Sequence, residues 1–202
     1  METKAQTRPQ RLTRAEQQAQ TRERLLAAAE RVFARHGYEG ASIDLISAEA
    51  GYSKGAIYSN FESKEAIFLA LTGLYMARSM ADLEKALEVP PEELADALNQ
   101  WLTNFQTDND CLLLVTELQL QARRSPAFAA SYYRLQEEQT RTLANNLKRY
   151  FKASGTAMPV NAMDLAGALI AITHGLALQR PQSDIGTPGR VIRAMMKLLT
   201  RP

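Results

Sequence analysis

Apolar residues recur every three or four positions along most of the chain, and no stretch of useful length alternates between apolar and polar residues as a strand does. The first apolar stripe predicts a helix from about Thr13 or Ala15 to His36, ended by Gly37. The apolar positions of this helix are Leu25, Leu26, Ala29, Val32 and Phe33. Eight further segments follow, so the chain is predicted to be all-α, with about nine helices.

Turn and capping residues divide the rest of the pattern. Pro90-Pro91 ends one long helix, Asp108-Asn109-Asp110 interrupts the pattern, and Ser125 is the expected N-cap ahead of Pro126. The helices are expected over residues 42–51, 53–61, 63–88, 92–107, 111–124, 126–151, 161–179 and 188–199.

The stretch from Ser42 to Phe61 has the pattern of two short helices joined by a tight turn. Ser42 and Ser53 are good N-caps, because their hydroxyl groups can accept free backbone N–H groups, and Gly51 tolerates the positive φ of a reversing chain. Each helix has one apolar face. Spacing alone is compatible with a DNA-reading helix-turn-helix and equally with a helical hairpin whose outer face is only solvated.

The second of these helices leaves small and polar side chains on its free face, as a helix that enters a DNA major groove requires. We expect these side chains, the caps and the start of the next helix to form the interface with DNA. Its candidate phosphate contacts are Ser42, Tyr58, Asn60 and Lys64, its candidate base-facing residues are Lys54, Gly55, Ala56 and Ser59, and Ser53 caps the helix between them.

Residues 51–65, GYSKGAIYSNFESKE, resemble the most characteristic stretch of the tetracycline-repressor (TetR) family of bacterial regulators. Residues 24–38, RLLAAAERVFARHGY, are similar to that family's first helix and the turn after it, so the resemblance covers about Thr21 to Phe68. Two positions depart from the family pattern: Ser47 stands where alanine is usual, and Tyr52 where valine is favoured. The resemblance implies a transcriptional regulator that binds double-stranded DNA.

The resemblance also implies how the rest of the chain is organised, since TetR-family members commonly carry an effector cavity among their middle helices and dimerise through their last two. We expect a flexible arm over residues 1–14, a helix-turn-helix domain over 15–64 and an effector-binding and dimerisation domain over 65–202. The last two predicted helices are apolar over a wide arc, which also indicates a homodimer. The polar arm is either a plain solvated tail or a segment that reaches a minor groove or phosphates.

Large or adaptable side chains in the second domain are the candidates for an effector pocket. Each of them is by default a core residue, but a cavity among them would favour a small apolar or aromatic molecule, oriented by Gln119, Glu117 or His174. The candidates are Tyr75, Met76, Trp101, Phe105, Leu118, Tyr132 and His174.

The charge distribution agrees with a DNA-binding N-terminal part. The net charge is only +2, but residues 1–64 carry ten Lys/Arg and eight Asp/Glu, whereas residues 65–202 carry fourteen of each. The excess positive charge therefore lies in the segment that holds the predicted DNA-reading helix.

Little in the sequence points to catalysis, a metal or a membrane. The two histidines and the single cysteine, Cys111, offer no zinc-ligand spacing, and no phosphate-binding glycine loop or nucleophile elbow is present, so no cofactor, metal or enzymatic activity is expected. Cys111 reads as a small buried hydrophobe in preference to a redox sensor. No apolar stretch approaches the roughly 20 residues of a membrane span, and the N-terminus lacks a signal peptide, which predicts a cytoplasmic protein.

The expected function is that of a ligand-responsive regulator, in the first instance a repressor that a small apolar or aromatic effector releases from a near-palindromic operator. The effector would act by changing the tilt of the long 63–88 helix. One alternative is the same DNA-binding head without a small ligand, controlled by a protein partner. Another is a helical enzyme in which the hairpin is only structural.

Overall fold

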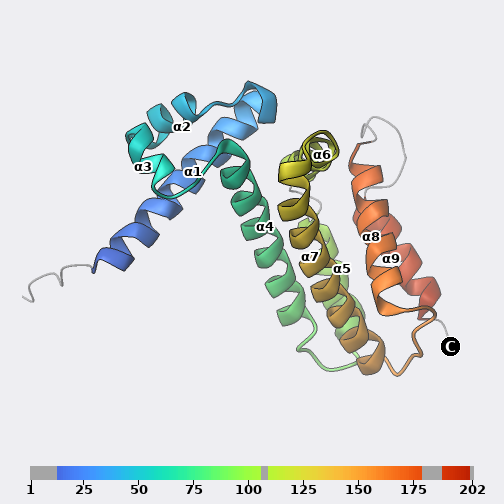
Figure 1. The fold of residues 1–202 in the computed structure, drawn as a ribbon. Coiled ribbons are helices and arrows are strands. Elements are labelled where there is room, and N and C mark those ends of the chain that lie inside the picture. Colours follow the sequence, from blue (N-terminus) through green and yellow to red (C-terminus); the bar gives the residue numbers. More distant parts are fainter. Residues whose placement is uncertain (1–12, 106–108, 179–187, 201–202) are drawn as a thin grey trace, which may run out of the picture. The chain divides into compact units, whose positions relative to one another are not determined.

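A computed structural model describes residues 13–105, 109–178 and 188–200, and all regular secondary structure in these ranges is helical. The nine helices of the described residues confirm the predicted all-α fold (Figure 1). They are α1 (Arg14–Gly40), α2 (Ile43–Ala50), α3 (Lys54–Tyr58), α4 (Lys64–Ala86), α5 (Leu94–Phe105), α6 (Asn109–Arg124), α7 (Pro126–Ala153), α8 (Ala162–Ala177) and α9 (Pro188–Leu199).

Local capping signals explain where several of these helices begin. Thr13 and Glu16 form a capping box at the start of α1, with the Thr13 Oγ1 accepting from the Glu16 N–H at 3.2 Å and the Glu16 carboxylate accepting from the Thr13 N–H at 2.7 Å. At the start of α8, Asn161 accepts from the Met163 N–H at 2.7 Å. Such bonds satisfy backbone donors that the first turn leaves free.

Several helix boundaries and one cap differ in detail from the prediction. The side chain of Ser125 makes no capping bond, although the residue is in the N-cap position of α7, so α7 begins with Pro126 and no side-chain cap. Helix α6 begins at Asn109, inside the predicted break, while residues 106–108 lie outside the described part of the chain. Gly37 interrupts α1 as expected, since its φ of 65° is left-handed, but the chain then makes one more helical turn.

The chain divides into two compact units, which we call the head, up to Ile67, and the body, from Phe68. In the head, α1 packs on α2 and α2 on α3. The buried residues that join these helices include Leu25, Phe33, Ile46 and Ile57, each at most 1% exposed. The short helices of the head are therefore held by one shared core.

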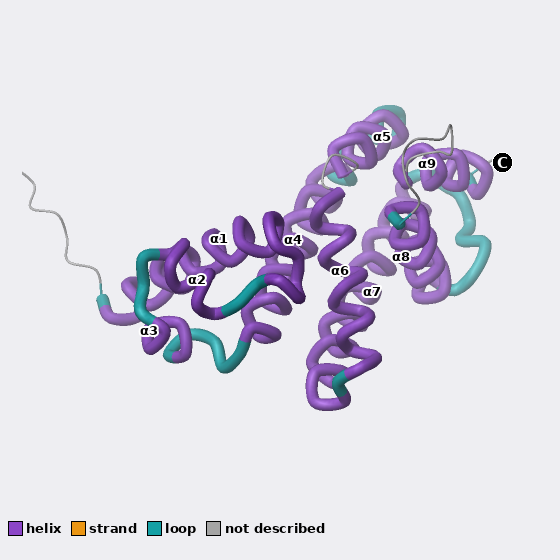
Figure 2. Tube along the Cα trace, turned by 90° about the horizontal axis from the view of Figure 1, so that it is seen from above, coloured by secondary structure: helices purple, strands orange, loops and turns teal. Residues whose placement is uncertain are grey.

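The body is a bundle of helices in which α7 packs against both α6 and α8, and α9 packs against α5 and α8 (Figure 2). The body core is built from all of these helices except α6, together with the second half of α4. Its buried members are Leu83, Leu87, Leu94, Leu102, Ala144, Leu147, Tyr150, Phe151, Ala162, Leu165, Ala166, Leu169, Ile192 and Met196.

Helix α4 is more apolar than predicted from the sequence, although it is slightly shorter than the predicted 63–88 helix. By length and composition alone it could cross a bilayer, so the expectation that no stretch approaches that length was wrong. Its buried residues, among them Phe68, Leu71 and Leu83, pack inside the protein, and charged residues such as Arg78 and Asp82 lie between them. The helix thus contributes to the body core, although only 28% of its most apolar window is buried.

Candidate nucleic-acid interface

The turn between α2 and α3 is fixed by caps on both sides. The Ser42 Oγ accepts from the Leu45 N–H at 3.2 Å, and the Ser53 Oγ accepts from the Ala56 N–H at 3.2 Å. Between them Gly51 has a φ of 69°, a left-handed conformation that residues with a Cβ rarely adopt. The local signals that the sequence offered at these three positions are therefore used as predicted.

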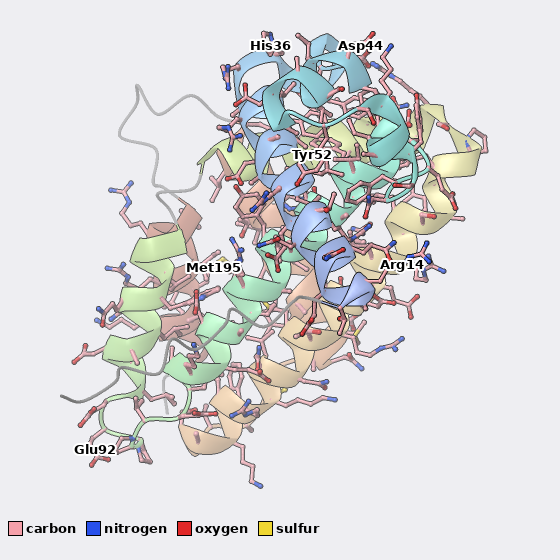
Figure 3. The ribbon with its side chains drawn as sticks, turned by 90° about the vertical axis from the view of Figure 1, so that its left-hand side faces the viewer. Arg14, His36, Asp44, Tyr52, Glu92 and Met195 are labelled. Atoms are coloured by element: carbon pink, nitrogen blue, oxygen red, sulfur yellow. The ribbon has the colours of Figure 1, made fainter. Side chains whose placement is uncertain are left out.

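The two departures from the family pattern meet in this turn. The Ser47 hydroxyl donates to the carbonyl oxygen of Tyr52, and the Tyr52 hydroxyl accepts from Arg24 Nη1 at 3.4 Å. Figure 3 shows Tyr52 beside the helices of the head. Ser47 thus replaces a plain packing contact with a hydrogen bond that holds the turn.

Helix α3 turns one face outward and buries the other. Lys54, Gly55 and Ser59 are exposed, Tyr58 retains 55% of its accessible surface, and Ile57 is fully buried on the opposite side. An exposed aromatic residue on a polar face is available to a partner. This arrangement supports the predicted division of α3 into an inner and an outer face.

Polar contacts terminate α3 after little more than one turn. The Ser59 hydroxyl and the Asn60 Nδ2 both donate to the Ala56 carbonyl oxygen, each at 2.8 Å. From α1, Arg22 Nη1 donates to the Asn60 carbonyl oxygen at 2.8 Å, and its guanidinium carbon lies 4.1 Å from the centre of the Phe61 ring. Such side-chain bonds compete with helix continuation, so α3 ends at Tyr58 instead of reaching Phe61.

Both lysines among the predicted DNA contacts also have partners in the free head. Lys54 forms an ion pair with Asp44 of α2, labelled in Figure 3, and this partner raises the pKa of the lysine. The Lys64 Nζ donates to the carbonyl oxygens of Tyr38 and Ala41 at 2.8 and 3.0 Å and lies 4.2 Å from the centre of the Tyr38 ring. Lys64 therefore also stabilises the end of α1, a role that sequence reasoning missed.

A clamp between α1 and α2 was missed as well. Glu49 accepts from Arg31 Nε at 2.6 Å and from Arg35 Nη2 at 2.7 Å, and these hydrogen bonds lower the pKa of its carboxyl group. The two arginines are one helical turn apart, which places them on one side of α1. That spacing is visible in the sequence, but the acidic partner on another helix is not.

The body contains a cavity of about 920 Å³, counting its open mouth, which lies among α4–α9. Of the seven predicted pocket residues, Met76, Trp101, Tyr132 and His174 line it, whereas Tyr75 and Leu118 are not among its walls. The side chain of Phe105 lies outside the described residues. The remaining walls are Thr72, Met80, Leu102, Val115, Leu135, Gln136, Gln139, Leu143, Leu169, Ile170, Thr173 and Ile192.

Burial alters two titratable groups of this cavity. It lowers the pKa of His174, which favours the neutral imidazole, and raises the pKa of Tyr132 to about 12, which keeps the phenol protonated. Among the residues that the structure describes, no group of three or more His, Cys, Asp or Glu side chains is arranged to hold a metal ion.

One face of α8 carries small, exposed residues. Ala168, Ala171 and Gly175 are exposed at helical spacing, while Ala166 and Leu169 are buried. A glycine at 175 has open space where a Cβ would lie, and Leu178 after the helix retains 57% of its accessible surface. An apolar, thin face of this kind permits close approach of another helix.

Comparison with known proteins agrees with the geometry of both units. Residues 25–71 match the family model for bacterial regulatory proteins of the tetR family, and residues 89–202, more than half of the chain, match the model for the tetracyclin repressor-like C-terminal domain. The model matches therefore cover the helix-turn-helix and nearly all of the body.

Individual proteins are similar over shorter or more diverged stretches. The transcriptional repressor AcnR of Corynebacterium efficiens is 35% identical over 112 residues, which are 55% of this chain and 56% of AcnR. The regulator YerO of Bacillus subtilis is 34% identical over 102 residues, which are 48% of this chain and 35% of YerO. The chain thus spans between about a third and just over half of the length of these curated relatives.

Among solved structures, GusR of Salmonella enterica has the same fold. It is 24% identical, with a TM-score of 0.71, and the superposition covers 95% of this chain and 99% of GusR. An identity this low carries the fold and nothing more. Together with the two family models, which span both units, it leads to one conclusion: the chain belongs to the TetR family of helix-turn-helix transcriptional regulators.

Proposed function

We propose that this protein is a cytoplasmic, homodimeric repressor that leaves a near-palindromic operator when a small, mainly apolar effector binds in the body. The observation that carries the proposal is the outer face of α3, where Lys54, Gly55, Tyr58 and Ser59 are exposed beside a buried Ile57. In a dimer, two such helices would enter successive major grooves about one helical turn apart.

Contacts at α3 divide by chemistry. Lys54, Gly55, Ala56 and Ser59 would face bases, because small residues allow close approach and the ammonium reaches base acceptors. Ser42, Tyr58 and Asn60 would chiefly hold phosphates, while Ser53 keeps α3 in shape. Lys64 has one further N–H available beyond its two backbone acceptors, so it can serve the head and a phosphate together.

The charge of the arm supports a role for it at the DNA backbone. Residues 1–14 carry four basic side chains and one acidic one, an excess of three positive charges in a chain whose net charge is +2. A positively charged segment next to the helix-turn-helix would be attracted to phosphates at low salt. Of the two alternatives for the arm, a DNA contact is therefore favoured over a plain tail.

The cavity favours an effector over control by a protein partner alone. It lies among six helices of the body, and its walls are mainly apolar with a few polar groups, as is usual for small-molecule sites. One side of α4 lines the cavity with Thr72, Met76 and Met80. A bound molecule would therefore contact a helix whose first residues belong to the head. The proposed signal is a shift in α4 that changes the separation of the two α3 helices of the dimer.

Tyr58→Ala tests the DNA-binding face. A duplex is first selected from random DNA by the unchanged protein, and affinity is then measured by fluorescence anisotropy at fixed salt. We expect a loss of about tenfold, because one phosphate or base contact to the hydroxyl and ring disappears. Tyr133→Ala removes the other strongly exposed tyrosine, which lies on α7 in the body, and should leave affinity unchanged.

The result has a clear contrary outcome. If the Tyr58→Ala protein folds and dimerises normally yet binds the selected duplex as tightly as the unchanged protein does, α3 does not lie against DNA in the proposed way. Failure of the unchanged protein to select any duplex sequence would remove the function altogether.

A further inference from the structure

The walls of the body cavity combine apolar side chains with a few neutral polar groups. Among the residues that the structure describes, none that lines the cavity is Asp, Glu, Lys or Arg. The polar wall residues are Thr72, Gln136, Gln139, Thr173 and His174, together with the Trp101 and Tyr132 rings. A charged molecule would lose its hydration there without meeting an opposite charge.

The hydroxyl groups of the two threonines donate to backbone carbonyl oxygens of their own helices. The Thr72 Oγ1 donates to the Phe68 carbonyl oxygen at 3.0 Å, and the Thr173 Oγ1 donates to the Leu169 carbonyl oxygen at 2.8 Å. The Trp101 Nε1 likewise donates to the Ser79 carbonyl oxygen at 3.1 Å. These three wall residues therefore direct donors to the backbone instead of to a molecule in the cavity.

Gln139 differs from them. Its amide Nε2 is buried and has no hydrogen-bond partner, although an amide nitrogen carries two N–H donors. A buried donor without an acceptor is costly, and buried polar groups in folded proteins are nearly always paired. Gln139 lines the cavity, but its Nε2 has almost no accessible surface there, so the amide would have to turn toward the cavity to meet a bound molecule. A molecule that supplies an acceptor oxygen to the turned amide would remove that cost.

The geometry points to an effector that is uncharged, mostly apolar or aromatic, and equipped with a ketone, ester or ether oxygen that accepts a hydrogen bond from Gln139 Nε2. The inference rests on the proposed function, since it names the chemical class of the effector for the same cavity. Gln139 is then the residue that sets specificity, because a site with a buried donor rejects an analogue that lacks the acceptor.

The state of His174 agrees with an uncharged ligand. Burial lowers the pKa of its imidazole, so the ring is neutral at neutral pH and adds no positive charge that would attract a carboxylate. An organic cation has no carboxylate to meet among the described walls either.

Asn146 provides a matched comparison for Gln139. Its Nδ2 is also buried without a partner, and it lies two helical turns further along α7, about 10 Å away. It lines a smaller neighbouring cavity of about 360 Å³ and is not part of the larger one. A substitution there changes a similar orphaned amide without touching the proposed site.

The test uses four probes of one shape. They are 4-tert-butylacetophenone, its isostere 4-tert-butyl-α-methylstyrene, in which a methylene replaces the carbonyl oxygen, 4-tert-butylbenzoate and 4-tert-butylphenyltrimethylammonium. Affinities are measured by calorimetry on the full-length protein. Trp101 is the single tryptophan of the chain and lines the cavity, so a change in its emission locates the bound probe.

We expect the ketone to bind about tenfold more tightly than the styrene, and both charged probes to bind more weakly than the ketone by at least about tenfold. Gln139→Met should bring the ketone and the styrene within about twofold of each other. Asn146→Leu should leave the tenfold preference intact.

Several outcomes overturn the inference. Equal binding of the ketone and the styrene by the unchanged protein overturns it, even if no variant folds. Tightest binding of a charged probe, or a ketone preference that persists in Gln139→Met, also overturns it. The same holds if none of the four probes changes the Trp101 emission. A protein that selects an operator but binds no probe loses only this inference. If the protein binds the ketone preferentially but binds no DNA, the proposed function fails, whereas the assigned specificity of the cavity stands.

Discussion

Single residues in the head serve both the fold and the interface, and Asp44 illustrates the competition between the two. It pairs with Lys54, a proposed base contact, and both side chains are more than half exposed. An exposed pair of this kind is weak, so DNA can displace the carboxylate at small cost. The acid nevertheless places a negative charge where phosphates would approach.

Removing that charge should strengthen binding. For Asp44→Asn we expect DNA affinity to rise about two- to fivefold at low salt, because Lys54 is released and a repulsion is lost, with the gain shrinking as salt increases. The measurement is anisotropy with the selected duplex across a salt series. Glu23→Gln removes the same charge from an exposed site on α1 and should give a smaller gain, whereas weaker binding by Asp44→Asn would mean that the acid orders Lys54 for contact.

The two lysines of the interface should differ in what they stabilise. Lys64→Met keeps the alkyl chain near the Tyr38 ring but removes the donors to two carbonyl oxygens, and we expect the free energy of unfolding to fall by about 2 kcal/mol. Lys54→Met removes an exposed charge and its weak ion pair with Asp44, and it should leave stability nearly unchanged. Chemical denaturation followed by circular dichroism separates the two, and an equal effect of both substitutions would contradict the assigned role of Lys64.

Among the elements, α1 and α2 are joined by a charge clamp whose strength depends on pH. Hydrogen bonds from Arg31 and Arg35 hold the pKa of Glu49 below its ordinary value of 4.5. A carboxyl with a depressed pKa contributes stability that is complete above 4.5 and is lost as the pH falls through the lower, folded pKa, because the unfolded chain then binds more protons.

Glu49→Gln should therefore lower the Tm of the protein at neutral pH and make the fall of Tm below pH 4.5 shallower than in the unchanged protein. The readout is a series of thermal melts from neutral to acidic pH. Glu39→Gln, at an exposed position at the end of α1, is the control and should keep the original slope. A Glu49→Gln protein with an unchanged pH profile would show that the clamp adds nothing to stability.

Helix positions and caps were readable from the sequence because they depend on neighbours in the chain. Ser42, Gly51 and Ser53 satisfy requirements of their own turns, and the structure uses all three as expected. The backbone partners of Lys64 were not readable, because they lie on another helix, and the expected capping bond of Ser125 is absent. Local signals predict local structure, and tertiary contacts override them.

The cavity was predictable only in part, for a geometric reason. Tyr75 and Met76 are adjacent on α4, so they point in different directions, and the sequence could not say which of them faces the cavity; the structure selects Met76. Gln139 looked like one of many polar positions on an amphipathic helix. Only the packing of α7 reveals that its amide is buried without a partner.

At the scale of the whole molecule, the proposed dimer follows from the exposed face of α8. Ala168, Ala171 and Gly175 are small, and the helix as a whole is rich in apolar residues, a combination that suits close packing against a second copy. A dimer also gives each operator two linked contacts, so the affinity of the pair exceeds that of one head by orders of magnitude.

Ala171→Arg should break this association. A long charged side chain on the thin face should yield monomers in light scattering and lower operator affinity by at least about a hundredfold, since the second half-site no longer binds as part of the same particle. Ala130→Arg makes the same change at an exposed alanine of α7, so it is the matched control and should remain dimeric. If the Ala171→Arg protein stays dimeric, the subunits meet through some other surface.

The shortness of α3 has an implication for engineering. Five residues are too few to stay helical in water unaided, and Ser53, Ile57 and the bonds at Asn60 supply the missing support. The side chains that supply it are separate from the outward-facing ones of Lys54, Gly55 and Tyr58. New promoter preferences could therefore be sought by randomising those three outer positions, with little risk that the library is lost to misfolding.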